Sequence, residues 1–195
     1  MNDGWTREVG GELEALAALA AEVARGQAAE VARFARLVHE TLRAGGVLLF
    51  CGNGGSAADA QHLAAEYVVR FRRGRKALPA LALTTDTSLL TACGNDLGFE
   101  ELFARQVEAL GRPGDLLVLH STSGRSPNLL RAAAAARAKG LKTAALLAQG
   151  GGPLRDQVDL AIVLPTEAVA RAQEVQLAIE HAVCELVDRE WSKAP

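Results

Sequence analysis

Five short apolar runs, each followed by a longer and more polar stretch, constrain the fold of this chain more than any other feature. The runs lie at residues 47–51, 80–84, 116–120, 143–147 and 160–164. A continuous apolar run of this length is typical of a strand that is buried on both faces. Segments with a helical pattern lie at about 56–71, 99–110, 128–139 and 168–191. Strands that alternate with helices predict an α/β fold, in which helices cover both faces of a parallel sheet.

The stretch before the first strand is rich in alanine. Its apolar residues over about 11–42 are spaced by three, four and more positions, which predicts one long helix or two helices joined near Gly26. No linker is long enough to divide the chain, and 195 residues suit one domain with a substantial core. We therefore expect a single domain over residues 1–195, with residues 1–43 as its N-terminal helical segment.

Charge and cysteine usage exclude several classes of protein. The net charge of −2 argues against nucleic-acid or membrane partners. No apolar run approaches the roughly 20 residues of a membrane span, and the opening residues lack a signal-peptide pattern. Three widely spaced cysteines suit a reducing cytoplasm, with Cys51 and Cys184 as buried thiols. One local cluster of positive charge is expected to be a solvated helix end, and it consists of Arg70, Arg72, Arg73 and Arg75.

Two loops of the predicted sheet have the composition of a phosphate site. Residues 52–56, Gly-Asn-Gly-Gly-Ser, follow the first strand, and residues 121–126, Ser-Thr-Ser-Gly-Arg-Ser, follow the third. Each loop leads into a helix, whose N-terminus favours an anion. Ligands of parallel sheets bind beyond the carboxyl ends of the strands, where both loops lie. The sequence therefore predicts a cradle of neutral donors for a monophosphate, although serine and threonine could alternatively be simple cap and turn residues.

Two helices of the pattern carry groups suited to proton transfer. His62 and Glu66 are spaced i, i+4 and share one helix face, and the closing helix carries Gln173 and His181. Exchange between an aldose and a ketose needs a base beside the carbonyl and acids for the two oxygens, and a metal ion could polarise those oxygens. The alternative is that the first two residues form a surface pair and that His181 is a core histidine.

The motifs together resemble one family. They run in order through Cys51-Gly-Asn-Gly-Gly-Ser-Ala-Ala-Asp-Ala-Gln-His62, residues 85–87 and 94–96, residues 121–128, and Gln173-Glu-Val ending at His181. Over nearly the whole chain the sequence is similar to the phosphoheptose isomerases of the sugar isomerase (SIS) domain superfamily. The resemblance implies a three-layer sandwich with a five-stranded, flavodoxin-like doubly wound sheet. It also implies a homotetramer built with the N-terminal helices, and conversion of sedoheptulose 7-phosphate to D-glycero-D-manno-heptose 7-phosphate for lipopolysaccharide heptose.

The resemblance also implies roles for individual residues. Glu66 and His181 would be the acid/base pair. The phosphate would be held by Ser56, Ser121, Thr122, Ser123 and Ser126. The sugar would contact Asn53, Asp96 and Gln173, and the binding set is completed by Gly54, Gly55 and Asn95. A zinc ion would be bound with modest affinity by His62, Glu66, Gln173 and His181.

The chain departs from the family pattern at three places. His120 stands where the family usually has an aliphatic residue or glycine, and Gln176 stands where it usually has histidine. Residues 167–169 stand where it usually has a small polar segment. None of these departures removes a proposed catalytic group.

Two alternatives remain open at this point. One is a non-catalytic SIS adaptor that binds the bacterial replication initiator, and the other is a SIS sensor or isomerase for another sugar phosphate. The adaptors lack the catalytic carboxylate and imidazole, so Glu66 and His181 favour the enzyme.

Overall fold

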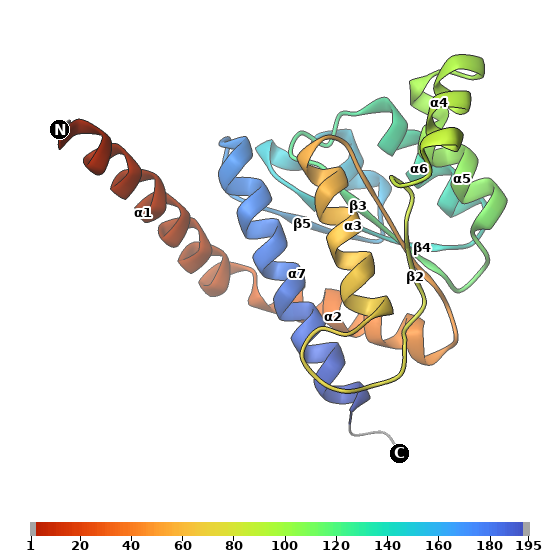
Figure 1. The fold of residues 1–195 in the computed structure, drawn as a ribbon, viewed down its shortest axis with the longest axis horizontal. Helices are drawn as coiled ribbons and strands as arrows, with labels where there is room; N and C mark the ends of the chain where they lie inside the picture. Colours follow the sequence, from red (N-terminus) through yellow and green to blue (C-terminus); the bar gives the residue numbers. More distant parts are fainter. Residues whose placement is uncertain (1–2, 193–195) are drawn as a thin grey trace.

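The computed structural model describes residues 3–192, so the extreme ends of the expected domain, residues 1–2 and 193–195, lie outside the described residues. The five expected strands are present as β1 (Leu48–Gly52), β2 (Ala80–Ala82), β3 (Leu116–His120), β4 (Lys142–Leu147) and β5 (Leu160–Val163). They form one parallel sheet in the order β2-β1-β3-β4-β5 (Figure 1). This is the strand order of a flavodoxin-like doubly wound sheet, as expected.

Alternate side chains of each strand enter two separate cores. In β1, Leu48 and Phe50 pack on one side of the sheet, and Leu49 and Cys51 pack on the other. The first core is closed by α2 (Ala28–Arg43), α3 (Gly55–Val68) and α7 (Val169–Trp191), and the second by α5 (Leu102–Leu110) and α6 (Pro127–Ala138). Burial on both faces explains why the strands are continuously apolar in sequence.

The N-terminal segment forms two helices, α1 (Asp3–Gly26) and α2, which is one of the two arrangements that the sequence left open. The break falls at Gln27, whose side-chain amide donates to the carbonyl of Val163 at 2.7 Å. The N-terminal part of α1 projects away from the rest of the molecule (Figure 1), whereas Leu19 and Val23 near its C-terminal end are buried in the first core. Three of its large apolar side chains, Trp5, Val9 and Leu13, are exposed.

The structure contains one helix that the sequence pattern did not predict, α4 (Thr87–Asp96). It begins at an N-cap aspartate, Asp86, whose carboxylate accepts from the amide of Leu89 at 3.0 Å. This N-cap was a usable signal in the sequence. The next predicted helix starts with a short 3-10 turn (Phe99–Glu101), and two more such turns (Gln149–Gly151, Pro153–Gln157) lie between β4 and β5.

The interpretation of the arginine cluster as a solvated helix end was wrong for Arg75. Its side chain is 2% exposed, and its Nε donates to Asp188 at 2.5 Å. Its Nη atoms donate to the backbone carbonyls of Glu66 and Tyr67 at 2.8 Å. The guanidinium therefore caps the C-terminus of α3, which ends at Val68, earlier than expected.

Two further findings concern the chain as a whole. None of the helices within residues 3–192 is long and apolar enough to cross a membrane. The cysteines Cys51, Cys93 and Cys184 are all buried free thiols. Burial raises the pKa of Cys184 to about 12, so this thiol stays protonated near neutral pH.

Candidate active site

The loops that follow β1 and β3 meet at one edge of the sheet, because these two strands are neighbours. Two amide side chains join the loops: Asn53 Nδ2 donates to Asn128 Oδ1 at 3.0 Å, and Asn128 Nδ2 donates to Asn53 Oδ1 at 2.8 Å. This edge is the switch point at which doubly wound sheets bind ligands. Asn128 was not among the predicted site residues. The sequence signal that could have identified it is a polar residue directly after Ser126 and Pro127, in the first turn of the helix that the phosphate loop leads into.

The loop after β3 forms a tight turn that leaves donors available. The Ser121 hydroxyl accepts from the amide of Gly124 at 3.0 Å, and the Ser123 hydroxyl accepts from the amide of Arg125 at 3.3 Å. Gly124 has a φ of +62°, and a Cβ there would overlap the Gly151 carbonyl, so this position requires glycine. Ser126 occupies the N-cap position of α6 without a side-chain capping bond. Its hydroxyl is therefore free to donate to an anion at this helix N-terminus.

The loop after β1 supplies the remaining predicted phosphate contacts. Gly54 has a φ of +57° and precedes α3, and the buried Ser56 lies in the first turn of that helix. A Cβ at Gly55 would come within 2.6 Å of the Gln173 side-chain nitrogen, so the glutamine amide lies directly against the loop. The structure thus brings Gln173 from α7 to the start of α3.

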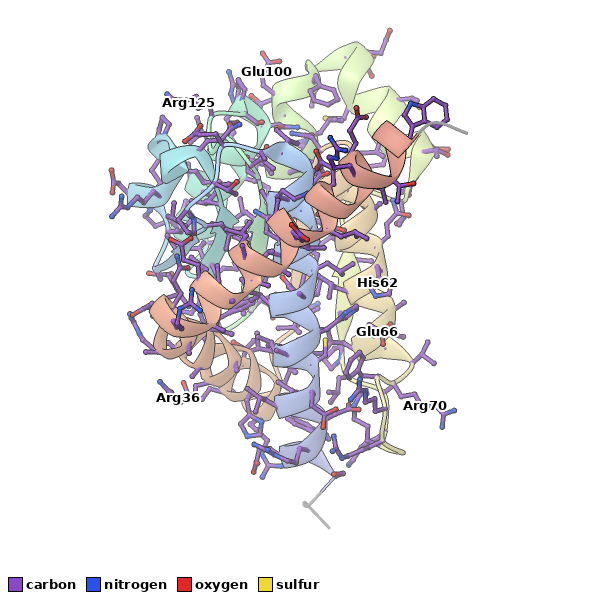
Figure 2. All side chains as sticks on the ribbon, turned by 90° about the vertical axis from the view of Figure 1, so that its left-hand side faces the viewer. Arg36, His62, Glu66, Arg70, Glu100 and Arg125 are labelled. Carbon is purple, nitrogen blue, oxygen red and sulfur yellow. The ribbon has the colours of Figure 1, made fainter. Side chains whose placement is uncertain are left out.

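The predicted acid/base groups form one cluster further along the same two helices. Nε2 of His62 lies 2.8 Å from Nε2 of His181 and 3.5 Å from Oε1 of Glu66. The ring of Phe71 stacks on His181 with centroids 5.4 Å apart. Figure 2 shows His62 and Glu66 on the same side of α3. Residues 119 positions apart therefore meet within one chain, and His181 is half-buried at this seam rather than a core histidine.

Asn95 and Asp96 are the predicted sugar contacts that this chain does not bring to the cluster. Both are exposed at the end of α4, where Asn95 Nδ2 donates to Asp96 Oδ1 at 2.7 Å. Thr122 lies in the loop after β3, where its carbonyl accepts from the amide of Ala148 at 3.1 Å.

A buried polar pair lies beneath the acid/base cluster. Nε2 of His120 is 2.7 Å from Oε1 of Glu180, and the two side chains are 0% and 1% exposed. Burial acts to lower the pKa of His120, but the charge and hydrogen bond of Glu180, together with the charge of Asp59, outweigh it and raise the pKa. Burial raises the pKa of Asp59 itself, against the opposing charges of His120 and His62. The imidazole of His120 is therefore stabilised in its charged form.

The predicted zinc donors are chemically suitable but are arranged as a hydrogen-bonded cluster. Two imidazoles and a carboxylate, from His62, His181 and Glu66, are donors that zinc accepts. The imidazole nitrogens are 2.8 Å apart, whereas two nitrogen ligands of one tetrahedral zinc lie about 3.3 Å apart. Among the described residues, no group of three or more His, Cys, Asp or Glu side chains forms a metal site.

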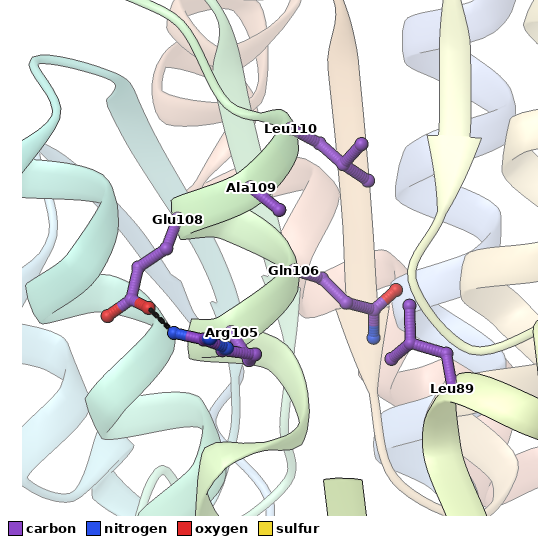
Figure 3. Close-up of a pocket in the computed structure, with 6 residues that line it drawn as sticks. All are labelled: Leu89, Arg105, Gln106, Glu108, Ala109 and Leu110. Carbon is purple, nitrogen blue, oxygen red and sulfur yellow. Dashed lines mark hydrogen bonds and ion pairs between the residues drawn. The ribbon is translucent and has the colours of Figure 1, made fainter. Parts of the chain in front are cut away.

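Hollows at the sheet edge leave room for a ligand beside the loops. One of about 480 Å³ is lined by Asn53, Ser126, Asn128 and Arg131, among others. A different hollow of about 350 Å³ lies beside α5 (Figure 3). It is lined by the exposed pair Arg105–Glu108 and by Gln106, whose amide already donates to two backbone carbonyls. This second hollow contains none of the predicted site residues.

Comparison with known proteins gives consistent results. Residues 13–148 match the family model described as SIS domain. The chain is 53% identical over 188 residues to a phosphoheptose isomerase of Roseiflexus sp. (strain RS-1), covering 96% of this chain and 95% of the relative. The solved structure of a phosphoheptose isomerase from Neisseria gonorrhoeae has a TM-score of 0.90 at 39% identity, covering 95% of this chain and 99% of that chain. That of a phosphoheptose isomerase from Francisella tularensis has a TM-score of 0.92 at 34% identity, covering 97% and 100%.

These similarities extend over nearly the whole chain, and they include both the sheet edge and the two helices that carry the predicted acid/base groups. They do not favour the adaptor alternative. The chain belongs to the SIS domain family and, within it, to the phosphoheptose isomerases.

Proposed function

We propose that this protein is an aldose–ketose isomerase, an intramolecular oxidoreductase, that converts sedoheptulose 7-phosphate to D-glycero-D-manno-heptose 7-phosphate. The observation that carries the proposal is the cluster of His62, Glu66 and His181 on the same seam of helices that begins at the phosphate loops. The relatives named phosphoheptose isomerase support the choice of substrate. The product would serve the synthesis of lipopolysaccharide heptose.

The spacing along α3 suits a substrate of about seven carbons. Ser56 lies six residues before His62 and ten before Glu66, so the helical rise separates the Cα atoms by about 9 and 15 Å. Helical side chains lean toward the N-terminus, which brings both groups back toward the loop. An extended chain advances about 1.2 Å per bond, so a seven-carbon sugar with its phosphate spans roughly 10 Å. A phosphate at the loops would thus place C1 and C2 near the cluster.

In the proposed mechanism, the hydroxyls of Ser56, Ser121, Thr122, Ser123 and Ser126 hold the phosphate, and Asn53 and Gln173 bind the sugar. Glu66 removes a proton from C1 of the open-chain ketose and returns it to C2. His181 transfers the proton of the C1 hydroxyl to the oxygen on C2. The enediol between these steps becomes the aldose without any net gain or loss of protons. Asn95 and Asp96 would join the site from another subunit.

Zinc is part of this proposal. His62, Glu66, Gln173 and His181 would hold the ion, which would polarise the two substrate oxygens. We expect the purified protein to take up about one zinc per chain in equilibrium dialysis, and His62→Ala to take up far less. Equal zinc uptake by both proteins would exclude this ligand set.

We further propose that residues 1–43 assemble the chain into a homotetramer. The exposed residues Trp5, Val9 and Leu13 form a stripe along α1 at helical spacing. An apolar hollow of about 300 Å³ also lies between α1, α2 and α7. Light scattering should give the mass of four chains, and Val9→Glu with Leu13→Glu should lower it. An unchanged mass would reject this role of α1.

The cytoplasm is the compartment we propose, because all three cysteines are free thiols, as reducing conditions favour.

The decisive experiment is turnover of sedoheptulose 7-phosphate, followed by NMR and compared with fructose 6-phosphate and other shorter ketose phosphates. We expect an aldose 7-phosphate from the seven-carbon substrate and slower turnover of the shorter ones. Faster turnover of a shorter ketose phosphate would indicate an isomerase for another sugar. No turnover, combined with binding to the bacterial replication initiator, would support the adaptor.

A further inference from the structure

We infer that the buried pair of His120 and Glu180 positions the phosphate loop relative to the acid/base helix. His120 is the last residue of β3 and immediately precedes Ser121, the first residue of the phosphate loop. Glu180 immediately precedes His181 on α7. A single hydrogen-bonded contact of 2.7 Å therefore joins the residues next to the two ends of the proposed site. This inference rests on the proposed function.

The pair is an unexpected choice for stability alone. The other residues of β3 are leucine and valine, and all are buried. Two ionisable side chains in such surroundings lose their hydration, and apolar residues of similar volume are often as stable or more stable. Apolar contacts are non-directional, however, whereas a hydrogen bond fixes the distance and orientation of its partners. The pair thus provides orientation that leucine in its place would not provide.

The geometry of α7 explains how orientation reaches His181. Successive residues of a helix are rotated by about 100°, so Glu180 can point at the sheet while His181 points along the seam toward α3. Fixing Glu180 against β3 therefore fixes both the rotation and the axial position of α7. These two quantities determine where the His181 imidazole lies relative to His62 and Glu66.

A second contact one turn earlier supports the same arrangement. Gln176 is fully buried, and its Nε2 donates to the carbonyl of Leu146 at 3.0 Å and lies 3.5 Å from the carbonyl of Ser121. The ring of Phe50 stacks on His120, with centroids 6.2 Å apart, and limits its rotation. Helix α7 is therefore tied at two successive turns to the ends of β3 and β4, and β3 leads into the phosphate loop.

Neither member of the pair can touch a substrate, because neither side chain has appreciable exposed surface. They are positioning residues that act through Ser121 and His181. The key variant is His120→Leu with Glu180→Leu, which removes both polar partners together, so that neither is left buried without the other. Glu180→Gln is the conservative variant, because its amide can still hydrogen bond to His120. Asp115→Asn is the matched control: Asp115 is also buried beside β3 but lies at its opposite end, where it accepts from two backbone amides.

We expect the double variant, His120→Leu with Glu180→Leu, to fold and its kcat/KM to fall about 10–100-fold. Glu180→Gln should retain most of the wild-type kcat/KM. The control should keep the kcat and KM of the wild type in its folded fraction. A second measurement does not depend on turnover. The chain has four histidines, His39, His62, His120 and His181, so their ring signals can be assigned by substitution in ¹⁵N NMR spectra. In the double variant, the ring signals of His62 and His181 should shift, and the ring signal of His39 should stay unchanged.

If the double variant keeps the kcat, the KM and the His62 and His181 signals of the wild type, the inference is overturned. If that variant does not fold, Glu180→Gln and Glu180→Ala are compared at a temperature where both are folded, and equal kcat/KM values overturn it. An inactive wild type would instead reject the proposed function. In that case shifted His62 and His181 signals would still support the positioning role, and unshifted signals would reject it.

Discussion

The two faces of the sheet are covered by helical layers of different character. On the side of α5 and α6, most buried side chains are leucine, alanine, valine or phenylalanine, and the buried polar side chains of these two helices, Gln106 and Asn128, are uncharged amides. On the side of α3 and α7, two pairs of ionisable side chains are buried: His120 of β3 with Glu180, and Arg75 with Asp188. The first layer, called the apolar layer below, has no charged residue among the buried residues of its two helices. The second contains polar groups that a stable fold does not need.

The difference follows the location of the proposed site. The acid/base cluster lies on the outer surface of the seam between α3 and α7, and both buried pairs hold that seam. Arg75 binds the carbonyl of Glu66 directly, and Glu180 precedes His181. Directional contacts therefore gather where side chains must be held at particular positions, while the apolar layer contributes stability without such constraint.

The comparison predicts first that removing a proton-transfer group affects activity and not stability. Glu66→Gln should lower kcat by about 10²–10⁴-fold, because the proposed general base is lost. Its half-buried position at the helix surface should leave the free energy of unfolding nearly unchanged. Steady-state kinetics and urea unfolding test both parts, with the exposed Glu40→Gln as control. Full activity in Glu66→Gln would remove the residue from the mechanism.

The second prediction concerns the buried pair at the end of α3. Arg75→Met should lower the free energy of unfolding by about 3–5 kcal/mol, because Asp188 remains buried without its cationic partner. The exposed pair of Arg33 and Glu30 provides the control, and Arg33→Met should cost less than about 1 kcal/mol. Equal losses in urea unfolding would show that burial of the first pair has no energetic consequence.

The third prediction tests the apolar layer. Leu129→Ala in α6 should lower the free energy of unfolding by about 2–5 kcal/mol, because the side chain is 1% exposed and its removal leaves a cavity. The folded fraction should keep the kcat of the wild type. Leu110→Ala, at an exposed position, is the control and should change stability by less than about 1 kcal/mol. A large loss of kcat in folded Leu129→Ala would mean that the two layers do not differ in function.

The sequence predicted the elements of both layers, because burial on two faces leaves an apolar run that can be read directly. It missed α4, whose N-cap at Asp86 was readable but whose helix buries little apolar surface, with Cys93 as its buried residue. The pairing of His62 with His181 could not be derived from spacing, because it depends on how α3 packs against α7. The family resemblance supplied it. The pair of His120 and Glu180 was not foreseen, because a lone polar residue at a strand end gives no sign of a partner 60 residues away.

The last and smallest predicted effect uses pH to separate the layers. Burial acts to raise the pKa of Asp188, but hydrogen bonds from the amides of Arg73 and Arg72 and from Arg75 lower it below its ordinary value of 3.8. A carboxyl group with a lowered pKa in the folded state stabilises the protein above 3.8, and this contribution is lost as the pH falls through the folded-state value.

Acid titration of the free energy of unfolding should therefore show a loss that begins somewhat above pH 3.8 and continues below it. Asp188→Asn should be less stable at neutral pH and should lose less stability on acidification, because the titrating group is gone. Leu129→Ala, which changes the apolar layer alone, should follow the slope of the wild type at a lower overall stability. If Asp188→Asn keeps the slope of the wild type, the acid sensitivity arises elsewhere, and the buried charges on the α3 and α7 side do not distinguish the two layers in this respect.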